Sequence, residues 1–288
     1  MTGCRNSLWR MMLCAGMISC CMACTSSPFG DENIEATDYR TLTGRVTLED
    51  HAAPNDVYVW LGGTGFSART DSSGNFQLTL PPENTSGSAT ITGGAFDLYL
   101  YLANFKVARA QVFVQNGAFA FAQGDLDANG RLQGLAPLNK LLTIRTLASP
   151  TSVSFDYAGP IDILANVQAT LDSVTVILPK VVGGILGGII LRNKATGELF
   201  VHLPDPGADT RLVARIGGEG RSWRLIINKT RGLIPIGRYE IIPYILVEQE
   251  GLPPQLLQSL GSNVLELGPD FLKIPFKREL GEFIITGN

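Results

Sequence analysis

Short runs in which apolar and polar residues alternate fill most of the chain from Leu42 onward. Residues 57–61 (VYVWL) and residues 75–80 (NFQLTL) place alternate side chains on opposite faces. Such alternation is typical of β-strands, and turn residues separate the runs. The dipeptide Asn116-Gly117 stands between two further runs and predicts a tight hairpin. The pattern therefore predicts an all-β chain.

Seven further runs predict strands in the second half of the chain. They are residues 173–178, 188–192, 198–203, 211–216, 222–228, 238–247 and 271–276. Residues 253–261 predict one short helix, because proline stands at its start and glycine at its end. Ser149-Pro150-Thr151 is interpreted as a linker. The chain is thus expected to hold two β-sandwiches in tandem.

The first of these regions carries residues typical of one domain family. They are Gly44, Val46, Pro54, the turn Thr70-Asp71 with Gly74-Asn75-Phe76, Leu80 and Pro81. On these residues, segment 42–82 resembles the carboxypeptidase regulatory-like domain, also described as transthyretin-like or prealbumin-like. Two departures are Ala53, where the family usually has glycine, and the lack of a Pro-x-Gly-x-Tyr motif at the end of the next strand. The resemblance implies a mainly non-catalytic β-sandwich, used for stability, spacing and contact with proteins or glycans.

The N-terminus has the features of an export signal. Two arginines precede the uncharged run 11–23, and this run ends directly before Cys24. A basic start, a short apolar core and a small residue at the cut are typical of a secretory signal peptide. With Cys24 after the cut, it resembles a bacterial lipoprotein signal, although Cys21 stands where that family prefers leucine. Cleavage before Cys20, or an ordinary signal peptide cut near Ala23, are the alternatives.

The lipoprotein resemblance implies that Cys24 carries the lipid and anchors the chain to a membrane. Thr25 follows it, and in the sorting pattern of the family a residue other than aspartate implies the outer membrane or cell surface. The periplasmic face of the inner membrane is the alternative. All five cysteines lie within the first 24 residues, so we expect no disulfide framework and no cysteine-bound metal in the rest of the chain.

The expected organisation has four parts. They are a signal peptide (1–23), a lipidated tether (24–40), a carboxypeptidase regulatory-like sandwich (41–148) and a second sandwich (149–288), immunoglobulin-like or again transthyretin-like. The formal net charge of −3 gives no electrostatic basis for nucleic-acid binding.

A possible calcium loop occurs at residues 125–130. Asp125, Asp127 and Asn129 alternate as oxygen donors before a glycine, as such a loop requires. However, Ala136 occupies the twelfth position, where a glutamate should supply two oxygens. The alternative is a second Asn-Gly hairpin turn, with no cofactor in the chain.

A basic segment follows in the second half, between residues 211 and 238. Its members are Arg211, Arg215, Arg221, Arg224, Lys229, Arg231 and Arg238, against the single acidic residue Glu219. Such a patch on a lipid-tethered protein predicts contact with an anionic envelope polymer or an acidic partner. The alternative is a solvated strand face whose arginines pair with carboxylates on neighbouring strands.

Trp60 and Trp223 are candidates for stacking on a glycan, and burial in a core is the alternative.

Catalysis is not expected. The chain has only two histidines, His51 and His202, and lacks the nucleophile-elbow, zinc-peptidase and phosphate-loop motifs. The sequence therefore predicts a membrane-anchored, non-catalytic structural or binding module of the bacterial envelope that holds a protein or polysaccharide. The alternatives are a glycan-binding surface lipoprotein and an accessory subunit of an envelope hydrolase.

Overall fold

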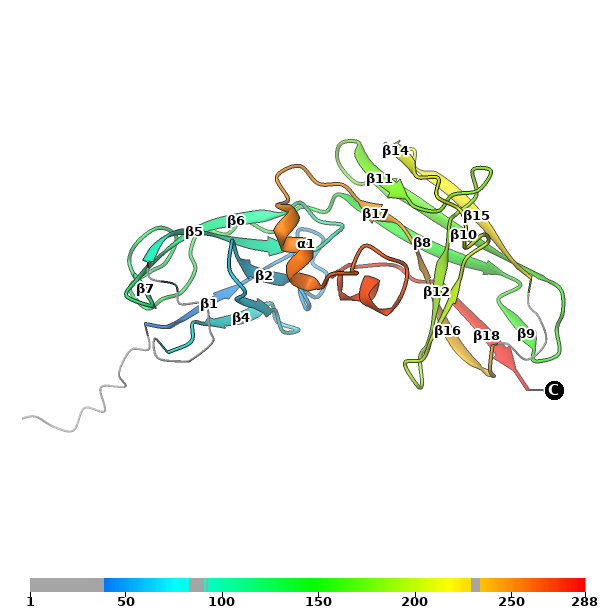
Figure 1. The fold of residues 1–288 in the computed structure, drawn as a ribbon, viewed down its shortest axis with the longest axis horizontal. Helices are drawn as coiled ribbons and strands as arrows, with labels where there is room; N and C mark the ends of the chain where they lie inside the picture. Colours follow the sequence, from blue (N-terminus) through cyan, green and yellow to red (C-terminus); the bar gives the residue numbers. More distant parts are fainter. Residues whose placement is uncertain (1–38, 83–90, 92, 229–233, 288) are drawn as a thin grey trace, which may run out of the picture. The chain divides into compact units, whose positions relative to one another are not determined.

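The computed structural model describes residues 39–82, 91, 93–228 and 234–287 (Figure 1). Strands dominate this part of the chain, which confirms the all-β prediction. The predicted signal peptide, Cys24, Lys229 and Arg231 lie outside the described residues. From Tyr39 onward the chain forms one compact unit, with three hydrophobic clusters.

The first sandwich consists of a two-stranded and a five-stranded antiparallel sheet (Figure 1). The smaller sheet pairs β1 (Thr41–Arg45) with β4 (Asn75–Thr79). The larger has the order β3 (Ser67–Arg69), β2 (Tyr58–Leu61), β5 (Gly93–Tyr101), β6 (Ala108–Gln115) and β7 (Ala118–Phe119). Between the sheets lies an apolar core that includes Leu42, Leu78 and Val112. The Asn116-Gly117 hairpin is confirmed: both residues have positive φ, and Gln115 pairs with Ala118.

The second sandwich is built from three sheets around a larger core. The first sheet holds β15 (Arg221–Asn228), β10 (Pro160–Ala169) and β8 (Leu142–Ser149). The second holds β14 (Leu212–Ile216), β11 (Val174–Leu178) and β17 (Leu246–Val247). The third has the order β13 (Leu199–His202), β12 (Ile189–Asn193), β16 (Gly237–Pro243), β18 (Glu282–Thr286) and β9 (Ser152–Ser154).

Two predictions for this half are corrected. The predicted linker at 149–151 is the connection between β8 and β9, and β8 already contributes Leu142 and Ile144 to the second core. The predicted strand 271–276 overlaps a 3₁₀ helix, η1 (Pro269–Lys273). Phe271 and Ile274 are both buried, and a spacing of three residues matches a 3₁₀ turn rather than a strand. The predicted short helix is confirmed as α1 (Pro254–Leu260).

A third hydrophobic cluster joins the two sandwiches. It covers the face of β2 and β5 that does not point into the first core, with Tyr58, Trp60 and Tyr101 as its aromatic members. The covering side chains come from α1, η1, β12 and β16, and they include Leu256, Phe271, Ile190 and Ile242. As a result, all four residues of β2 are buried. The Tyr58 hydroxyl also hydrogen-bonds the Ser259 hydroxyl at 2.9 Å.

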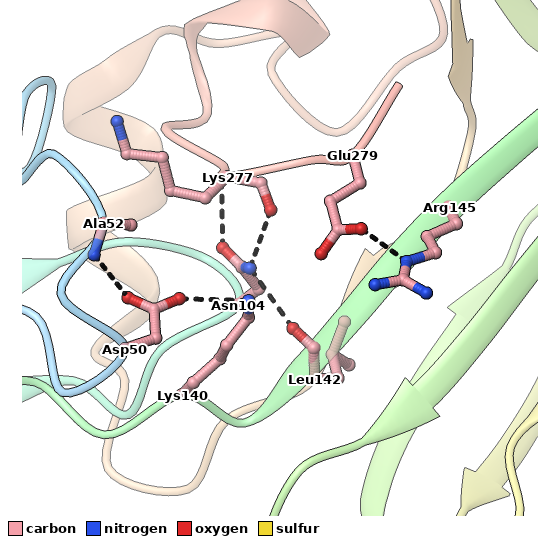
Figure 2. A network of polar contacts seen from close by, with 8 residues as sticks. All are labelled: Asp50, Ala52, Asn104, Lys140, Leu142, Arg145, Lys277 and Glu279. Atoms are coloured by element: carbon pink, nitrogen blue, oxygen red, sulfur yellow. Dashed lines mark hydrogen bonds and ion pairs between the residues drawn. The ribbon is translucent and has the colours of Figure 1, made fainter. Parts of the chain in front are cut away.

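A polar network supports the same junction, and Figure 2 shows it at close range. The fully buried Asn104 accepts the Lys277 N–H at 3.0 Å through Oδ1. Its Nδ2 donates to the carbonyls of Lys277 (2.8 Å) and Leu142 (3.2 Å). Beside it, Lys140 pairs with Asp50 at 3.0 Å. Because these bonds satisfy the buried amide, Asn104 fixes the β5–β6 connection against the start of β8.

Candidate functional site

The strongest candidate for a binding site is a groove of about 600 Å³ beside β11, β17 and α1. Apolar side chains dominate its lining, and they are Ile177, Pro179, Leu246, Val247, Leu252, Pro254, Leu257 and Leu265. We call this surface the β17 groove. Ligand pockets in proteins are typically concave and mostly apolar, with a small number of polar groups that set orientation.

Strand alternation explains why this floor is apolar. In β11, Val174, Val176 and Leu178 belong to the core of the second sandwich, so Ile177 lies on the opposite face. Ile177 pairs with Val213 on β14 and with Leu246 on β17. Because β17 has only two residues, the sheet ends early on that side and leaves room between Ile177 and Leu257 of α1. Leu265, which lines the groove, is 45% exposed, and Val213, which pairs with Ile177 outside the groove lining, is 56% exposed.

Five charged residues stand around this floor. They are Lys180, Asp209, Arg211, Glu248 and Glu266. Within the described part of the chain, none of the five forms an ion pair. Burial, together with the nearby carboxylate of Glu266, raises the pKa of the Tyr244 phenol to about 12, so it remains a hydrogen-bond donor at neutral pH. It donates to the Leu265 carbonyl and thereby fixes one wall of the groove.

The predicted basic patch is divided between two sheets. Arg211 lies just before β14 and reaches the β17 groove, whereas Arg221 and Arg224 belong to β15 in another sheet. Arg224 donates to Asp162 on β10 at 2.8 Å, which is the cross-strand pairing of the alternative interpretation. Arg215 donates to the Ser173 hydroxyl at 2.5 Å. The described members of the patch thus belong to two sheets, and Arg224 already has a carboxylate partner.

Both tryptophan candidates for glycan stacking are buried, so this prediction is wrong. Trp60 is 2% exposed and donates from Nε1 to the Thr64 carbonyl at 2.9 Å. Trp223 is 3% exposed, lies in the second core and has the Arg221 guanidinium 5.2 Å from its ring centre. Neither ring presents a flat face to solvent. The alternative, core burial, holds for both residues.

The carboxylates of the 125–130 loop accept hydrogen bonds from other groups of the same chain. Asp127 Oδ1 accepts the N–H groups of Asn129 (2.9 Å) and Arg131 (2.8 Å), and Oδ2 accepts from Gln133 Nε2 at 3.0 Å. Asp125 Oδ2 accepts the Gln111 N–H at 2.6 Å. These bonds close a turn in which Leu126 pairs with Leu132. Among the described residues, no three His, Cys, Asp or Glu side chains gather around a point that could hold a metal.

The two histidines lie apart from the groove lining. His51 is exposed in a loop, with a positive φ of 56°. His202 ends β13, and burial lowers the pKa of its imidazole. The groove residues themselves were missed in the sequence. The nearest signal was Val213, an apolar residue on the outward face of β14 that pairs with Ile177 of the groove but does not itself line it.

No protein-family model matches this chain, and no curated protein matches it. A solved structure that shows some likeness is an interface mutant of a type II cohesin–X-dockerin complex from Acetivibrio cellulolyticus. The match has 22% sequence identity and a TM-score of 0.19, and it covers 28% of this chain and 47% of that chain. The match therefore spans less than half the length of the cohesin-complex chain. Separately, none of the helices in the described residues is long and apolar enough to cross a membrane.

Proposed function

We propose that this chain is a non-catalytic, lipid-anchored binding module of the bacterial envelope, and that it holds a segment of a partner protein in the β17 groove. The observation that carries the proposal is the combination of an apolar floor with five unpaired charges around it, within the described residues. Two exposed cations elsewhere on the same sandwich do have carboxylate partners: Arg224 pairs with Asp162 and Arg238 pairs with Glu282.

The chemistry of the groove favours a protein segment over a glycan. Glycan sites use exposed aromatic rings, but the groove floor is aliphatic and both candidate tryptophans are buried. The rim carries three carboxylates and two cations, so it complements a ligand of mixed charge rather than a uniformly anionic polymer. A peptide segment with apolar side chains between charged ones meets both requirements.

Site-specific photocrosslinking tests the groove in the intact, membrane-bound chain. A crosslinking amino acid at Leu265, inside the groove, should capture the same partner in repeated preparations, because 45% of this side chain is exposed. The matched control is Leu147 on β8, which is 56% exposed and does not line the groove. Ile177→Glu should remove the Leu265 adduct, because it places a carboxylate in the apolar floor. Identical adducts from both positions, or an adduct that survives Ile177→Glu, would contradict the proposal.

The lipid anchor is tested separately from the groove. Metabolic labelling with a clickable fatty acid should mark the wild-type chain, and Cys24→Ala should abolish the label. Cys21→Ala is the matched control and should keep it. Two or more acyl chains are enough for stable anchoring, so the labelled protein should sediment with membranes. Equal labelling of Cys24→Ala and wild type would move the anchor elsewhere without affecting the groove proposal.

A further inference from the structure

Strand β14 is the outer strand of the sheet whose opposite edge, β17, borders the β17 groove (Figure 1). The pairing inside this sheet determines where the main-chain groups of β14 point. On the central strand β11, the Thr175 carbonyl accepts the Glu248 N–H at 3.0 Å, so Thr175 directs its main-chain groups toward β17. The residues on either side of Thr175 therefore bond to β14, where Val176 faces Ala214.

The alternate residues of β14 direct their main-chain groups away from β11. Within the strand these residues are Val213 and Arg215. The carbonyl of Thr210 still accepts a bond from the β11 side, from the Val181 N–H, so the same alternation places Arg211 with the outward set. Within the described part of the chain, no hydrogen bond is found for the main-chain groups of these three residues. They form an open edge to which another strand can add, and we call it the β14 edge.

The side chains of the same three residues set the chemistry of the β14 edge. All three are exposed and alternate onto one face, with Val213, which is 56% exposed, between the two arginines. Neither guanidinium forms an ion pair with a described residue. Arg215 donates from Nε to the Ser173 hydroxyl, which uses one of the five N–H donors of that side chain. A strand that pairs here therefore meets a cation, a valine and a second cation on one face.

A hollow of about 420 Å³ adjoins the beginning of β14. Leu212 lines it together with Val181, Val182 and Ala208, so much of its wall is apolar. Strands that add to the edge of a sheet gain affinity from main-chain hydrogen bonds, and pockets for alternate side chains give specificity. The hollow provides such a pocket for an apolar side chain at one end of the edge.

Charge distinguishes a second copy of this chain from a different partner. If two copies of β14 paired as antiparallel strands about Val213, Arg211 of each copy would lie opposite Arg215 of the other. In a parallel pair in register, each arginine would lie opposite itself. Like charges directly opposite each other destabilise a strand pair, whereas opposite charges stabilise it. The β14 edge thus disfavours its own copy and complements carboxylates.

We propose that the β14 edge binds an extended segment of a partner protein by strand addition. The segment carries an acidic, an apolar and an acidic side chain at alternate positions, opposite Arg211, Val213 and Arg215. This site goes beyond the proposed function, because it lies at the other edge of the sheet and does not require the β17 groove to be occupied.

Fluorescence anisotropy with a dye-labelled peptide tests the edge on the full-length protein in detergent micelles. The probe is acetyl-Thr-Glu-Thr-Val-Thr-Glu-Thr-amide, and the control peptide has lysine in place of both glutamates. The wild type should bind the glutamate peptide saturably and at least about tenfold more tightly than the lysine peptide, because two attractive cross-strand pairs become repulsive. No saturable binding of the glutamate peptide, or equal affinity for the two peptides, would overturn the proposal.

N-methylation of the peptide tests the main-chain hydrogen bonds. In an antiparallel pair the peptide valine exchanges bonds with Val213, whereas in a parallel pair the threonines beside it do so. A methyl group on the nitrogen that points at β14, either that of the valine or that of the following threonine, should therefore weaken binding. Binding that neither methyl group changes would overturn strand addition.

Variants of the chain assign the peptide to the β14 edge. Arg211→Glu with Arg215→Glu should reverse the preference, so that the lysine peptide binds more tightly. Lys106→Glu, which changes an exposed cation of the first sandwich, should keep the wild-type preference. Val213→Pro removes an outward N–H that makes no bond to β11, so it should abolish binding. The charge reversal decides even if Val213→Pro does not fold.

One further variant separates this site from the β17 groove. Leu265→Glu places a carboxylate in the groove lining, away from β14, and should leave peptide binding unchanged. Binding that is lost in Leu265→Glu but unaffected by the charge reversal would place the peptide in the groove and overturn this inference. A dimer of the peptide-free chain that Val213→Pro disrupts would assign the β14 edge to a second copy and would also overturn it.

Discussion

Two turns of the first sandwich share one pattern of hydrogen bonds, although the sequence suggests an ordinary strand-connecting turn for the first and a calcium loop for the second. In the first turn, Asp71 Oδ1 accepts the N–H groups of Ser73 (2.8 Å) and Asn75 (2.9 Å). In the second turn, Asp127 Oδ1 accepts the N–H groups of Asn129 (2.9 Å) and Arg131 (2.8 Å), which stand at the same spacing. A glycine with positive φ stands three residues after each aspartate, Gly74 at 83° and Gly130 at 73°.

The turns differ in what surrounds the glycine. A Cβ added at Gly74 would lie 2.1 Å from the Val46 carbonyl oxygen, which is backbone. A Cβ added at Gly130 would lie 2.2 Å from the end of the Phe121 ring, a side chain that can rotate away. In both turns, backbone N–H groups donate to the aspartate of an Asp-x-x-Gly segment, so this spacing alone does not indicate a metal site. The comparison of the two glycines also indicates that the first turn is held more tightly by its environment.

The glycine substitutions should give the largest effects and separate the two turns. Gly74→Ala should destabilise the chain by about 3 kcal/mol, because positive φ and a clash with backbone act together. Gly130→Ala should cost about 1–2 kcal/mol, because only the backbone strain persists after Phe121 moves. Urea unfolding measures both, with Gly65→Ala, which meets no atom within 4 Å, as the control. Equal losses at Gly74 and Gly130 would refute the difference between the turns.

Acid titration should reveal what the two turns share. Hydrogen bonds from backbone N–H groups lower the pKa of Asp71 and Asp127 below the ordinary aspartate value. Because the folded pKa is below the unfolded value of about 3.9, each group contributes stability above that pH. The contribution is lost as the pH falls through the folded pKa. The double variant Asp71→Asn with Asp127→Asn keeps an acceptor oxygen but cannot titrate, so its melting temperature should fall less steeply below about pH 4. Parallel acid profiles for this variant and wild type would contradict the prediction.

Removing the partner of the second carboxylate oxygen should have a smaller effect. Gln133 Nε2 donates to Asp127 Oδ2 at 3.0 Å, and Asn75 Nδ2 donates to Asp71 Oδ2 at 3.3 Å. Both pairs are exposed, so Gln133→Ala and Asn75→Ala should each lower the melting temperature by on the order of 1–2 °C. The shorter contact predicts that Gln133→Ala has the larger shift. Differential scanning calorimetry measures both shifts, and a larger shift for Asn75→Ala than for Gln133→Ala would contradict this prediction.

Calcium should have the smallest effect, because Asp127 already uses both carboxylate oxygens. Millimolar calcium should leave the melting temperature of wild type unchanged, with magnesium as the control for ionic strength. A saturable rise with calcium that disappears in Asp127→Asn would show that the second turn is a metal site after all. The two turns would then differ in chemistry as well as in surroundings.

The sequence allowed local structure to be predicted where the determinants are close together along the chain. The alternation in VYVWL assigned Val59 and Trp60 to opposite faces, and the prolines and glycine around 253–261 defined α1. The burial of Trp60 could not be predicted, because its cover comes from residues such as Leu256 and Phe271, about two hundred positions away. For the same reason the β17 groove could not be predicted from the sequence. Its walls come from segments that have no local pattern in common.

The third hydrophobic cluster also has a consequence for the order in which the protein can fold. Tyr58 bonds to Ser259, Arg69 to the Lys273 carbonyl, and Asn55 to Lys277, at sequence separations of 201, 204 and 222 residues. Contacts of such high order form slowly, and domains begin to fold from the N-terminus during synthesis. The aromatic face of β2 must therefore wait until nearly the whole chain has been made. A chain truncated before α1 would lose the part of the cover that comes from α1 and η1 and would be prone to aggregate. We therefore expect the last 35 residues, 254–288, to protect an apolar face formed by β2, close to the start of the folded region.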